Sequence, residues 1–270
     1  MATISMEASP FQSLTDGMVK GFYAWKREDR TTEEETAMER LDKILAATGR
    51  WSRKEAKALV KAGRVLVDGA PPAGPEQKIG ENQTVLVDGH PISTEKYTYL
   101  MLHKPAGVVS STEDPREETV LSLLPKELRR IGLFPVGRLD KDTEGLLLLT
   151  NDGQLAHRLL SPARHVDKVY YAEVDGVLTE EDRTAFRAGM TLGDGTRCLP
   201  AELELLEETN RCLVTLREGK YHQVKRMLAA RGKPVAYLKR LSMGPLRLDP
   251  ELPPGAWRPL EDAEIAAFVL

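Results

Sequence analysis

Residues 135–153 constrain the fold of this chain more than any other stretch. A turn that contains Gly137, Asp140 and Gly145 runs directly into four consecutive leucines, and Thr-Asn-Asp-Gly follows at 150–153. A short apolar run bounded by turn residues on both sides is typical of a buried strand. A carboxylate fixed between two glycine turns and backed by such a strand is held rigidly, as nucleophilic or acid-base chemistry requires. We therefore predict a catalytic loop around Asp140.

Two other interpretations of this loop exist. Asp140, Asp142, Glu144 and Gly145 match the first six positions of an EF-hand calcium loop. The match fails at the twelfth position, which is Asn151 where a bidentate carboxylate is required, and the seventh to tenth positions are leucines. Alternatively, Asp140 only caps a turn. The sequence by itself leaves both interpretations open.

The size and charge of the chain limit the possible classes of protein. With 270 residues the chain is long enough for two modest domains, each with its own core. No apolar run approaches the length of a membrane span, and the N-terminal residues lack a secretory signal, so we expect a cytoplasmic protein with no membrane contact. Cys198 and Cys212 lack metal-ligand spacing, so we expect two free thiols and no metal site. The net charge of −3 means that any contact with nucleic acid must be local.

The pattern from residue 38 onward predicts a small domain. Residues 1–37 carry seven acidic and four basic side chains without a lasting hydrophobic period, so we expect a flexible tail. Apolar residues at 41, 44 and 45 then form one face of a helix, and Ser52 with Glu55 forms a capping box that begins a second helix through Lys61. Strands are expected at 64–67 and 84–87, and a linker at 89–96.

The two helices of this segment carry a local excess of positive charge. Between residues 38 and 69 there are eight basic and four acidic side chains, which gives a local charge of +4. Most charged stripes are only solvated helix faces, and that interpretation applies here too. The alternative is a patch that binds RNA phosphates, and its candidate residues are Arg40, Lys43, Arg50, Arg53, Lys54, Lys57, Lys61 and Arg64.

The rest of the chain alternates strands and helices. Strands are expected at 97–103, 145–150, 168–174, 211–217 and within 235–248, and helices at 154–160, 180–188, 221–230 and near the C-terminus. Several connections are too short for parallel crossovers, so the pattern predicts an α+β domain with a mixed, mainly antiparallel sheet flanked by helices.

Both halves of the chain resemble known families. Arg-Leu-Asp-Lys-Ile-Leu at 40–45, Ser-Arg-Lys-Glu-Ala at 52–56 and Gly-Arg-Val-Leu-Val-Asp-Gly at 63–69 are similar to the S4 RNA-binding domain. Gly-Arg-Leu-Asp at 137–140, with the leucine run after it, closely resembles the catalytic motif of RNA pseudouridine synthases that modify ribosomal RNA. The resemblance implies a tail at 1–37, an S4-like domain at 38–96 and a catalytic domain at 97–270.

The same resemblance implies a set of site residues. It names Asp140 as the nucleophile, Lys225 as its basic partner and Tyr170 as the aromatic residue near the target base. Lys225 lies within Tyr-His-Gln-Val-Lys-Arg-Met, a string similar to the branch of the family that acts on the small subunit. The implied substrate contacts are Arg138, His222, Gln223, Leu238 and Arg240.

The implied function is the isomerisation of one uridine in small-subunit (16S) ribosomal RNA, without a cofactor. The expected partner is ribosomal RNA or the assembling small subunit, and we expect the protein to be a monomer. Two alternatives remain: an enzyme of the same fold that acts on large-subunit (23S) RNA, and a non-catalytic RNA-binding assembly factor. The second predicts the loss of at least one catalytic position, whereas Asp140, Tyr170 and Lys225 are all present.

Overall fold

The computed structural model describes residues 38–269, except 81, 94, 96, 162, 163 and 165. The predicted tail, residues 1–37, lies outside the described residues. The chain divides into two compact units: the first holds the residues up to 96 together with Lys126–Ile131, and the second holds the rest. Among the described residues, no helix combines the length and the apolar character that a membrane crossing needs.

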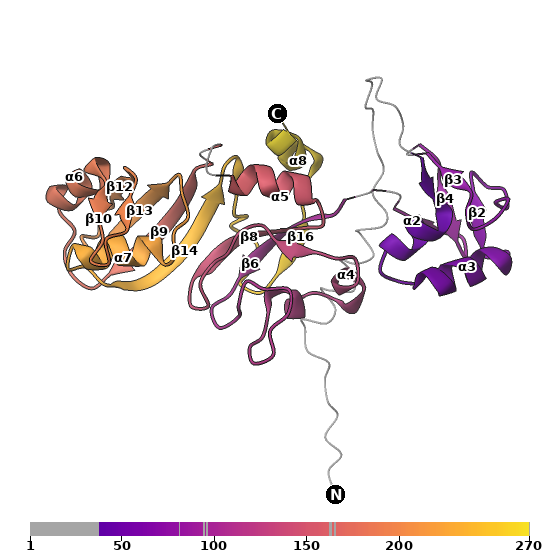
Figure 1. Cartoon of the computed structure of the whole chain (residues 1–270), viewed down its shortest axis with the longest axis horizontal. Coiled ribbons are helices and arrows are strands. Elements are labelled where there is room, and N and C mark those ends of the chain that lie inside the picture. The colour runs from indigo at the N-terminus through magenta and orange to yellow at the C-terminus, as the bar shows by residue number, and fades with distance from the viewer. Residues whose placement is uncertain are drawn as a thin grey trace, which may run out of the picture. The chain divides into compact units, whose positions relative to one another are not determined.

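The first unit is a small α/β structure. Its main elements pack around one core, in which Leu41, Leu45, Val65 and Val85 are fully buried. Ser52 and Glu55 form the predicted capping box at the start of the second helix. The elements drawn in indigo and purple in Figure 1 are β1 (Glu39–Arg40), α2 (Leu41–Ala47), α3 (Arg53–Lys61), β2 (Val65–Val67), β3 (Lys78–Ile79), β4 (Val85–Val87) and β5 (His90–Ile92). The unit also includes α4 (Lys126–Arg129), which comes from further along the chain.

The linker expected at 89–96 is wrong in its first part. β5 pairs antiparallel with β4, and Ile92 is buried in the core of the unit. The connection is a two-residue turn, in which Asp88 has φ 51° and Gly89 has φ 77°. Asp-Gly with both residues at positive φ is the turn that closes a tight hairpin. The Asp-Gly pair therefore continues the sheet instead of ending the domain.

The second unit is built on one nine-stranded sheet with the strand order β12-β13-β9-β14-β8-β6-β16, to which β15 and β7 add at β14 and β8. Only β14 and β8 run parallel among these pairs, which confirms the predicted mixed, mainly antiparallel sheet. The strands are β6 (Tyr99–Lys104), β7 (Phe134–Pro135), β8 (Glu144–Thr150), β9 (Lys168–Val174), β12 (Glu202–Leu205), β13 (Arg211–Leu216), β14 (Val235–Met243), β15 (Leu246–Arg247) and β16 (Trp257–Pro259).

Helices cover the two ends of this sheet (Figure 1). Over β9, β13 and β14, the core contains Phe186 of one helix and Met227 of another, and over β8 and β6 it contains Leu155. Both cysteines are buried free thiols. The remaining elements are the 3₁₀ helix η1 (Val120–Leu123), α5 (Gly153–Leu160), α6 (Glu180–Ala188), the hairpin of β10 (Met190–Thr191) with β11 (Arg197–Cys198), α7 (Gln223–Ala230) and α8 (Asp262–Val269).

The helix predicted at 221–230 begins two residues later than expected. α7 starts at Gln223, and His222 before it has left-handed backbone angles, φ 48° and ψ 35°. In a helix that began at Tyr221, the spacing of Tyr221, Val224 and Leu228 predicts one buried stripe. Instead Tyr221 is 75% exposed, while the other two are buried as predicted. A positive φ at His222 turns the chain before the helix starts and directs Tyr221 outward.

The parallel joint between β8 and β14 depends on a glycine. Gly145 lies opposite Arg240 and has φ 106°. A Cβ atom at position 145 would lie 2.2 Å from the carbonyl oxygen of Arg240 and 2.6 Å from its nitrogen. Only glycine permits both this backbone angle and this approach. Because Gly145 directly follows the Asp140 turn, the same glycine fixes where the loop meets the sheet.

We therefore expect Gly145→Ala to lower the free energy of unfolding by about 3 kcal/mol or more, through backbone strain and overpacking. Chemical denaturation measures this loss. Gly153→Ala is the matched control, because a Cβ there meets no atom within 4 Å and its φ is not positive. Equal stabilities of the two variants would contradict the role given to Gly145.

Candidate functional site

A buried lysine binds the backbone of the Asp140 loop from the protein interior. Lys104, the last residue of β6, is fully buried, and its Nζ donates to three backbone carbonyl oxygens. These belong to Pro105 at 2.9 Å, Lys141 at 3.2 Å and Thr143 at 2.8 Å. Burial lowers the pKa of Lys104 to about 8, so the ammonium form still predominates near pH 7. Lys141 and Thr143, which follow Asp140 in the chain, are thus bound to one buried cation through their carbonyl oxygens.

A serine fixes the backbone of the residue that precedes Asp140. The Oγ of Ser110 donates to the carbonyl oxygen of Leu139 at 2.9 Å and accepts from the amide of the same residue at 3.0 Å. The amide of Gly107 donates to Lys141. Sequence reasoning missed Lys104 and Ser110, because a single lysine or serine gives no sign that it will be buried.

The loop presents Asp140 to two basic side chains from the start of α7. The Nζ of Lys225 lies 3.3 Å from Oδ2 of Asp140, and Nε2 of His222 lies 3.4 Å from Oδ1. The same Nζ is 2.5 Å from Oδ1 of Asp142, and this hydrogen bond lowers the pKa of Asp142. The Asp140 side chain is 27% exposed, so an incoming group can reach it. The structure therefore brings together Asp140, Lys225 and His222, which the sequence placed 82 to 85 positions apart.

Tyr170 lies in the same sheet as the loop. On neighbouring strands, Tyr170 of β9 pairs with Arg240 of β14, which pairs with Gly145 of β8. Two strand spacings place the Cα of Tyr170 about 10 Å from that of Gly145. Tyr170 is half-buried and packs against the core that α7 covers. Tyr170 thus lies on the face of the sheet that α7 covers, and α7 is the helix that carries Lys225.

The other predicted substrate contacts differ in exposure. Arg138 is exposed, two residues before Asp140. Leu238 is 5% exposed within the core under α7, and Arg240 is 2% exposed and donates through Nε to the carbonyl oxygen of Leu146. Gln223 is also buried, where it bonds the turn before α7. In this structure the last three side chains lie inside the protein, and only Arg138 and His222 face outward.

The calcium-loop interpretation is wrong. The residues after Gly145 form a central strand of the sheet, not the entering helix of an EF-hand. Within the described ranges, no three His, Cys, Asp or Glu side chains cluster as metal ligands. The turn-cap interpretation covers only the backbone of Asp140, whose carbonyl oxygen accepts from the amide of Thr143 at 3.1 Å. Its carboxylate faces Lys225 and His222.

In the first unit, a buried carboxylate organises the basic patch. Asp42 is fully buried and accepts from Nε and Nη2 of Arg40 at 3.0 and 3.1 Å. Arg53 and Lys57 on α3 each lie 3.8 Å from the same carboxylate. The hydrogen bond from Arg40 is the main cause that lowers the pKa of Asp42, so it stays ionised. One buried charge thereby holds three cations from two elements close together.

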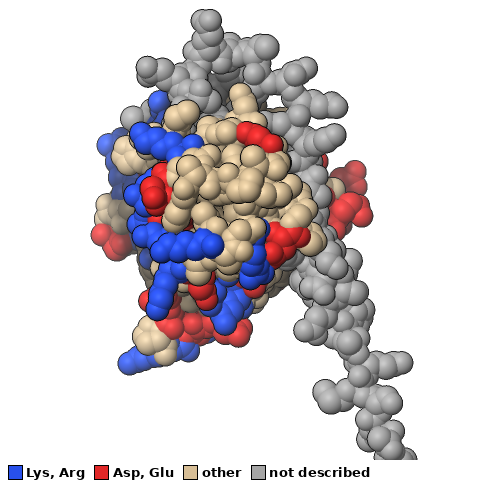
Figure 2. Space-filling model, turned by 90° about the vertical axis from the view of Figure 1, so that its right-hand side faces the viewer, with Lys and Arg blue, Asp and Glu red and all other residues tan. Residues whose placement is uncertain are grey.

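The remaining cations of the patch differ in their partners. Lys43 pairs with Glu39, and Arg64 binds Asp88 through two hydrogen bonds. Lys54 and Lys61 are exposed and form no ion pair within the described part of the chain. Figure 2 views the first unit and shows Lys and Arg side chains along its left and lower edges, interspersed with Asp and Glu. The guanidinium of Arg50 lies 6.0 Å from the ring centre of Trp51.

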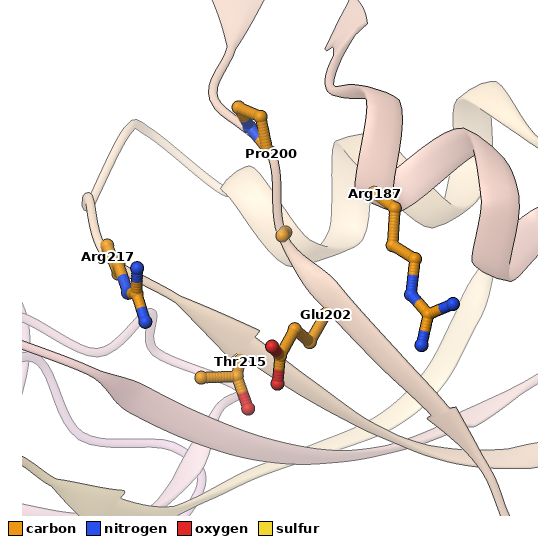
Figure 3. A pocket seen from close by; sticks show the side chains of 6 residues that line it. Arg187, Pro200, Glu202, Thr215 and Arg217 are labelled. Atoms are coloured by element: carbon orange, nitrogen blue, oxygen red, sulfur yellow. The ribbon is translucent and has the colours of Figure 1, made fainter.

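A separate hollow of about 320 Å³ lies beside β12 and β13. Figure 3 shows Arg187 of α6 and Arg217 next to Glu202 and Thr215 on its walls. Arg217 also pairs with Asp167 at 2.8 Å. None of the residues predicted from the sequence lines this hollow, so it is distinct from the Asp140 cluster.

Two family models match the chain. Residues 39–85 match the model of the S4 domain, and residues 98–230 match that of RNA pseudouridylate synthase. The second match contains Asp140, Tyr170 and Lys225.

Individual relatives cover most of the chain. An uncharacterized RNA pseudouridine synthase of Bacillus subtilis, YtzG, is 49% identical over 230 residues, which are 84% of this chain and 96% of the relative. Ribosomal small subunit pseudouridine synthase A of Pseudomonas aeruginosa is 43% identical over 231 residues, with 84% and 99% covered. A crystal structure of a pseudouridylate synthase has a TM-score of 0.61 at 34% identity and covers 85% of this chain and 99% of its own.

Removing the buried ammonium should loosen the loop. We expect Lys104→Met to cost about 2–4 kcal/mol of unfolding free energy and to lower kcat at least about tenfold, because three carbonyls lose a donor and Asp140 loses its support. Denaturation and turnover assays measure the two effects. Lys141→Met is the control: its exposed ion pair with Glu117 should contribute less than about 1 kcal/mol. Wild-type turnover by the Lys104 variant would refute the positioning role.

Neutralising the α3 stripe should weaken RNA binding and reduce its salt dependence. The slope of log K against log salt concentration is negative, and we expect Arg53→Gln, Lys57→Gln and Lys61→Gln together to reduce its magnitude by about 2 to 3, if each residue neutralises one phosphate. Asp42 keeps Arg40 as its partner in this variant, so the fold should persist. Filter binding across a salt series measures the slope. An unchanged slope would show that these residues only solvate the helix.

Proposed function

This chain belongs to the RNA pseudouridine synthase family, and we propose that it isomerises a specific uridine of small-subunit ribosomal RNA. The chain is an RNA pseudouridine synthase with an S4 RNA-binding domain ahead of its catalytic domain. The observation that carries the proposal is the contact of Asp140 with Lys225 and His222, at the motif that the family shares. The named substrate of the relative from Pseudomonas aeruginosa supplies the RNA class.

The proposed reaction is internally balanced. The bond between C1′ of the ribose and N1 of uracil breaks, the base rotates, and a bond between C1′ and C5 forms. C5 releases a proton and N1 gains one, so no electrons are lost or gained and the product is an isomer. The reaction as proposed therefore calls for no redox partner.

We assign the roles as follows. Asp140 acts as the nucleophile, since its carboxylate is partly exposed and fixed on a loop tied on both sides. Lys225 stabilises the charged form of that carboxylate from 3.3 Å. Tyr170, on the α7 side of the sheet, relays the proton released from C5, directly or through a water molecule.

The target base must leave its stack before it can reach Asp140. Flipping a nucleotide out of stacked RNA costs a few kcal/mol, which contacts in the site must offset. Arg138 is exposed two residues before Asp140, and we assign to it contacts with the displaced strand. The S4 domain contacts phosphates through its basic patch, so it contributes affinity and position, whereas the catalytic domain selects the uridine.

Two alternatives are less favoured. An enzyme of large-subunit RNA would share the fold and the loop, but the relative named above for its substrate acts on the small subunit. A non-catalytic assembly factor would not need Asp140 to face two basic side chains. The cytoplasmic location and the monomeric state stay predictions.

Asp140→Asn should abolish the release of tritium from 5-tritiated uridine in small-subunit ribosomal RNA. The amide keeps the shape of the side chain but removes its nucleophilic charge, so RNA affinity should change less than about threefold while turnover disappears.

Asp142→Asn is the matched control, because Asp142 contacts the same Lys225 but its side chain is 74% exposed. It should retain turnover. If Asp140→Asn released tritium at the wild-type rate, Asp140 would lose its role. Mapping of pseudouridine in ribosomal RNA from a strain without this protein would identify the uridine, and an unchanged small-subunit map would refute the proposed substrate.

A further inference from the structure

An exposed aromatic side chain stands next to the catalytic cluster. Tyr221 is 75% exposed, more than any other large apolar side chain in the described part of the chain. Its ring stacks on the ring of His222 with a centroid distance of 3.8 Å and an angle of 19° between the planes. The Nε2 of His222 in turn lies 3.4 Å from Asp140. A continuous path of contacts thus leads from the reacting carboxylate to an open aromatic face.

The turn that carries Tyr221 is held rigidly. The amide of Lys220 donates to Oε1 of Gln223 at 2.9 Å, and Nε2 of Gln223 donates to Oε1 of Glu218 at 2.5 Å. The Nζ of Lys220 donates to Oε2 of Glu218 at 2.7 Å, and Glu218 also accepts from the amide of Leu199. Gln223 is buried at the centre of this network. Hydrogen bonds therefore hold Lys220 and Gln223, the residues on either side of Tyr221 and His222.

The backbone also supports this arrangement. His222 adopts left-handed angles, which a residue other than glycine rarely takes unless its surroundings enforce them. As a result Tyr221 is directed away from the core and the imidazole of His222 toward Asp140. The two rings lie stacked, with 19° between their planes, directly before α7 begins at Gln223.

We propose that Tyr221 is a stacking platform for a nucleobase that flanks the target uridine. This inference rests on the proposed function and adds a second base subsite beside the cluster of Asp140, Lys225 and His222. One face of the Tyr221 ring is covered by His222, and the exposed remainder of the ring accepts a base. Stacking on aromatic side chains is how proteins hold unstacked RNA bases without selecting their sequence.

The contacts indicate that the occupant is a neighbour and not the reacting base. His222 contacts Asp140 through its edge atom Nε2 and Tyr221 through its ring face, so a base on the outer face of Tyr221 lies two ring spacings from the His222 ring that meets Asp140. The reacting base must instead touch Asp140. Holding a flanking base would stabilise the RNA strand in the distorted form from which the target uridine is flipped.

Steady-state kinetics of tritium release test this proposal. We expect Tyr221→Ala to raise KM about tenfold, as the loss of one stacked base predicts, with kcat changed less than about threefold. Tyr221→Phe should behave as wild type, because it keeps the ring. Val177→Ala is the control for truncating an exposed apolar side chain. Val177 is 55% exposed and comes three residues after Val174, the last residue of β9. Equal melting temperatures will show that all variants fold.

Substrates that lack one base supply the second measurement. RNAs are prepared with an abasic nucleotide at each position flanking the target uridine. At one position the wild type should lose the same factor in KM as Tyr221→Ala loses on intact RNA, and the variant should lose nothing further. Unchanged KM in Tyr221→Ala, an equal defect in Tyr221→Phe, or additive losses at every flanking position would each overturn the proposal.

Fluorescence separates this proposal from the proposed function. A short oligouridine that contains one 2-aminopurine reports base stacking without any turnover. Wild type and Tyr221→Phe should quench its emission on binding, and Tyr221→Ala should quench it less. If the wild type isomerised no uridine, the proposed function would fail while this measurement still tested the platform. If turnover were intact but quenching did not depend on the ring, only the platform would be wrong.

Discussion

The ammonium of Lys104 is the interaction on which the site depends. A charge in the interior is unfavourable unless hydrogen bonds compensate for the lost water, and here three backbone carbonyls, two of them in the Asp140 loop, provide them. The loop residues after Asp140 cannot move outward without exposing this cation to an apolar surrounding. Gly145 adds a steric limit at the same place, because the backbone of Arg240 leaves no room for a side chain. The carboxylate of Asp140 is thus positioned by groups that never meet the RNA.

The choice of lysine at position 225 fits the geometry around it. A guanidinium favours one carboxylate, which it binds through two parallel hydrogen bonds. An ammonium is a compact charge that two carboxylates can share, and Lys225 contacts both Asp140 and Asp142. Its shorter distance is to Asp142, which is mostly exposed. The carboxylate of Asp140 is therefore paired by charge but keeps an open side for the substrate.

Much of this architecture could be predicted from the sequence, because long elements show a hydrophobic period and capping residues. The capping box at Ser52, the strand at Lys168–Val174 and the helix at Glu180–Ala188 were all expected as they occur. The strands β1, β3 and β16, each of two or three residues, were not predicted, because no Asp-Gly turn follows them as one follows β2 and β4. They exist only through their partners in the sheet.

The site was predictable in part, from motifs instead of period and caps. Asp140 and Lys225 stand in motifs whose resemblance to the family implied that the two are partners, and the loop lies on the sheet as expected. Lys104 and Arg240 could not be placed, since their long charged side chains normally lie at the surface and are buried here by backbone carbonyls far away in sequence. Tyr221 was placed on the wrong face because its spacing fitted a helical stripe, while the conformation of His222 ended that stripe.

The misplaced tyrosine shows how local geometry produces a recognition surface. Had α7 begun at Tyr221, the ring would have joined the core and His222 would have lain on the helix flank. One residue with positive φ instead exposes an aromatic face and brings an imidazole to Asp140. The surrounding hydrogen bonds of Glu218 and Gln223 hold this arrangement before RNA arrives. Because the order is already present in the free protein, a base that stacks there loses only its own freedom, and the binding energy is kept for opening the RNA.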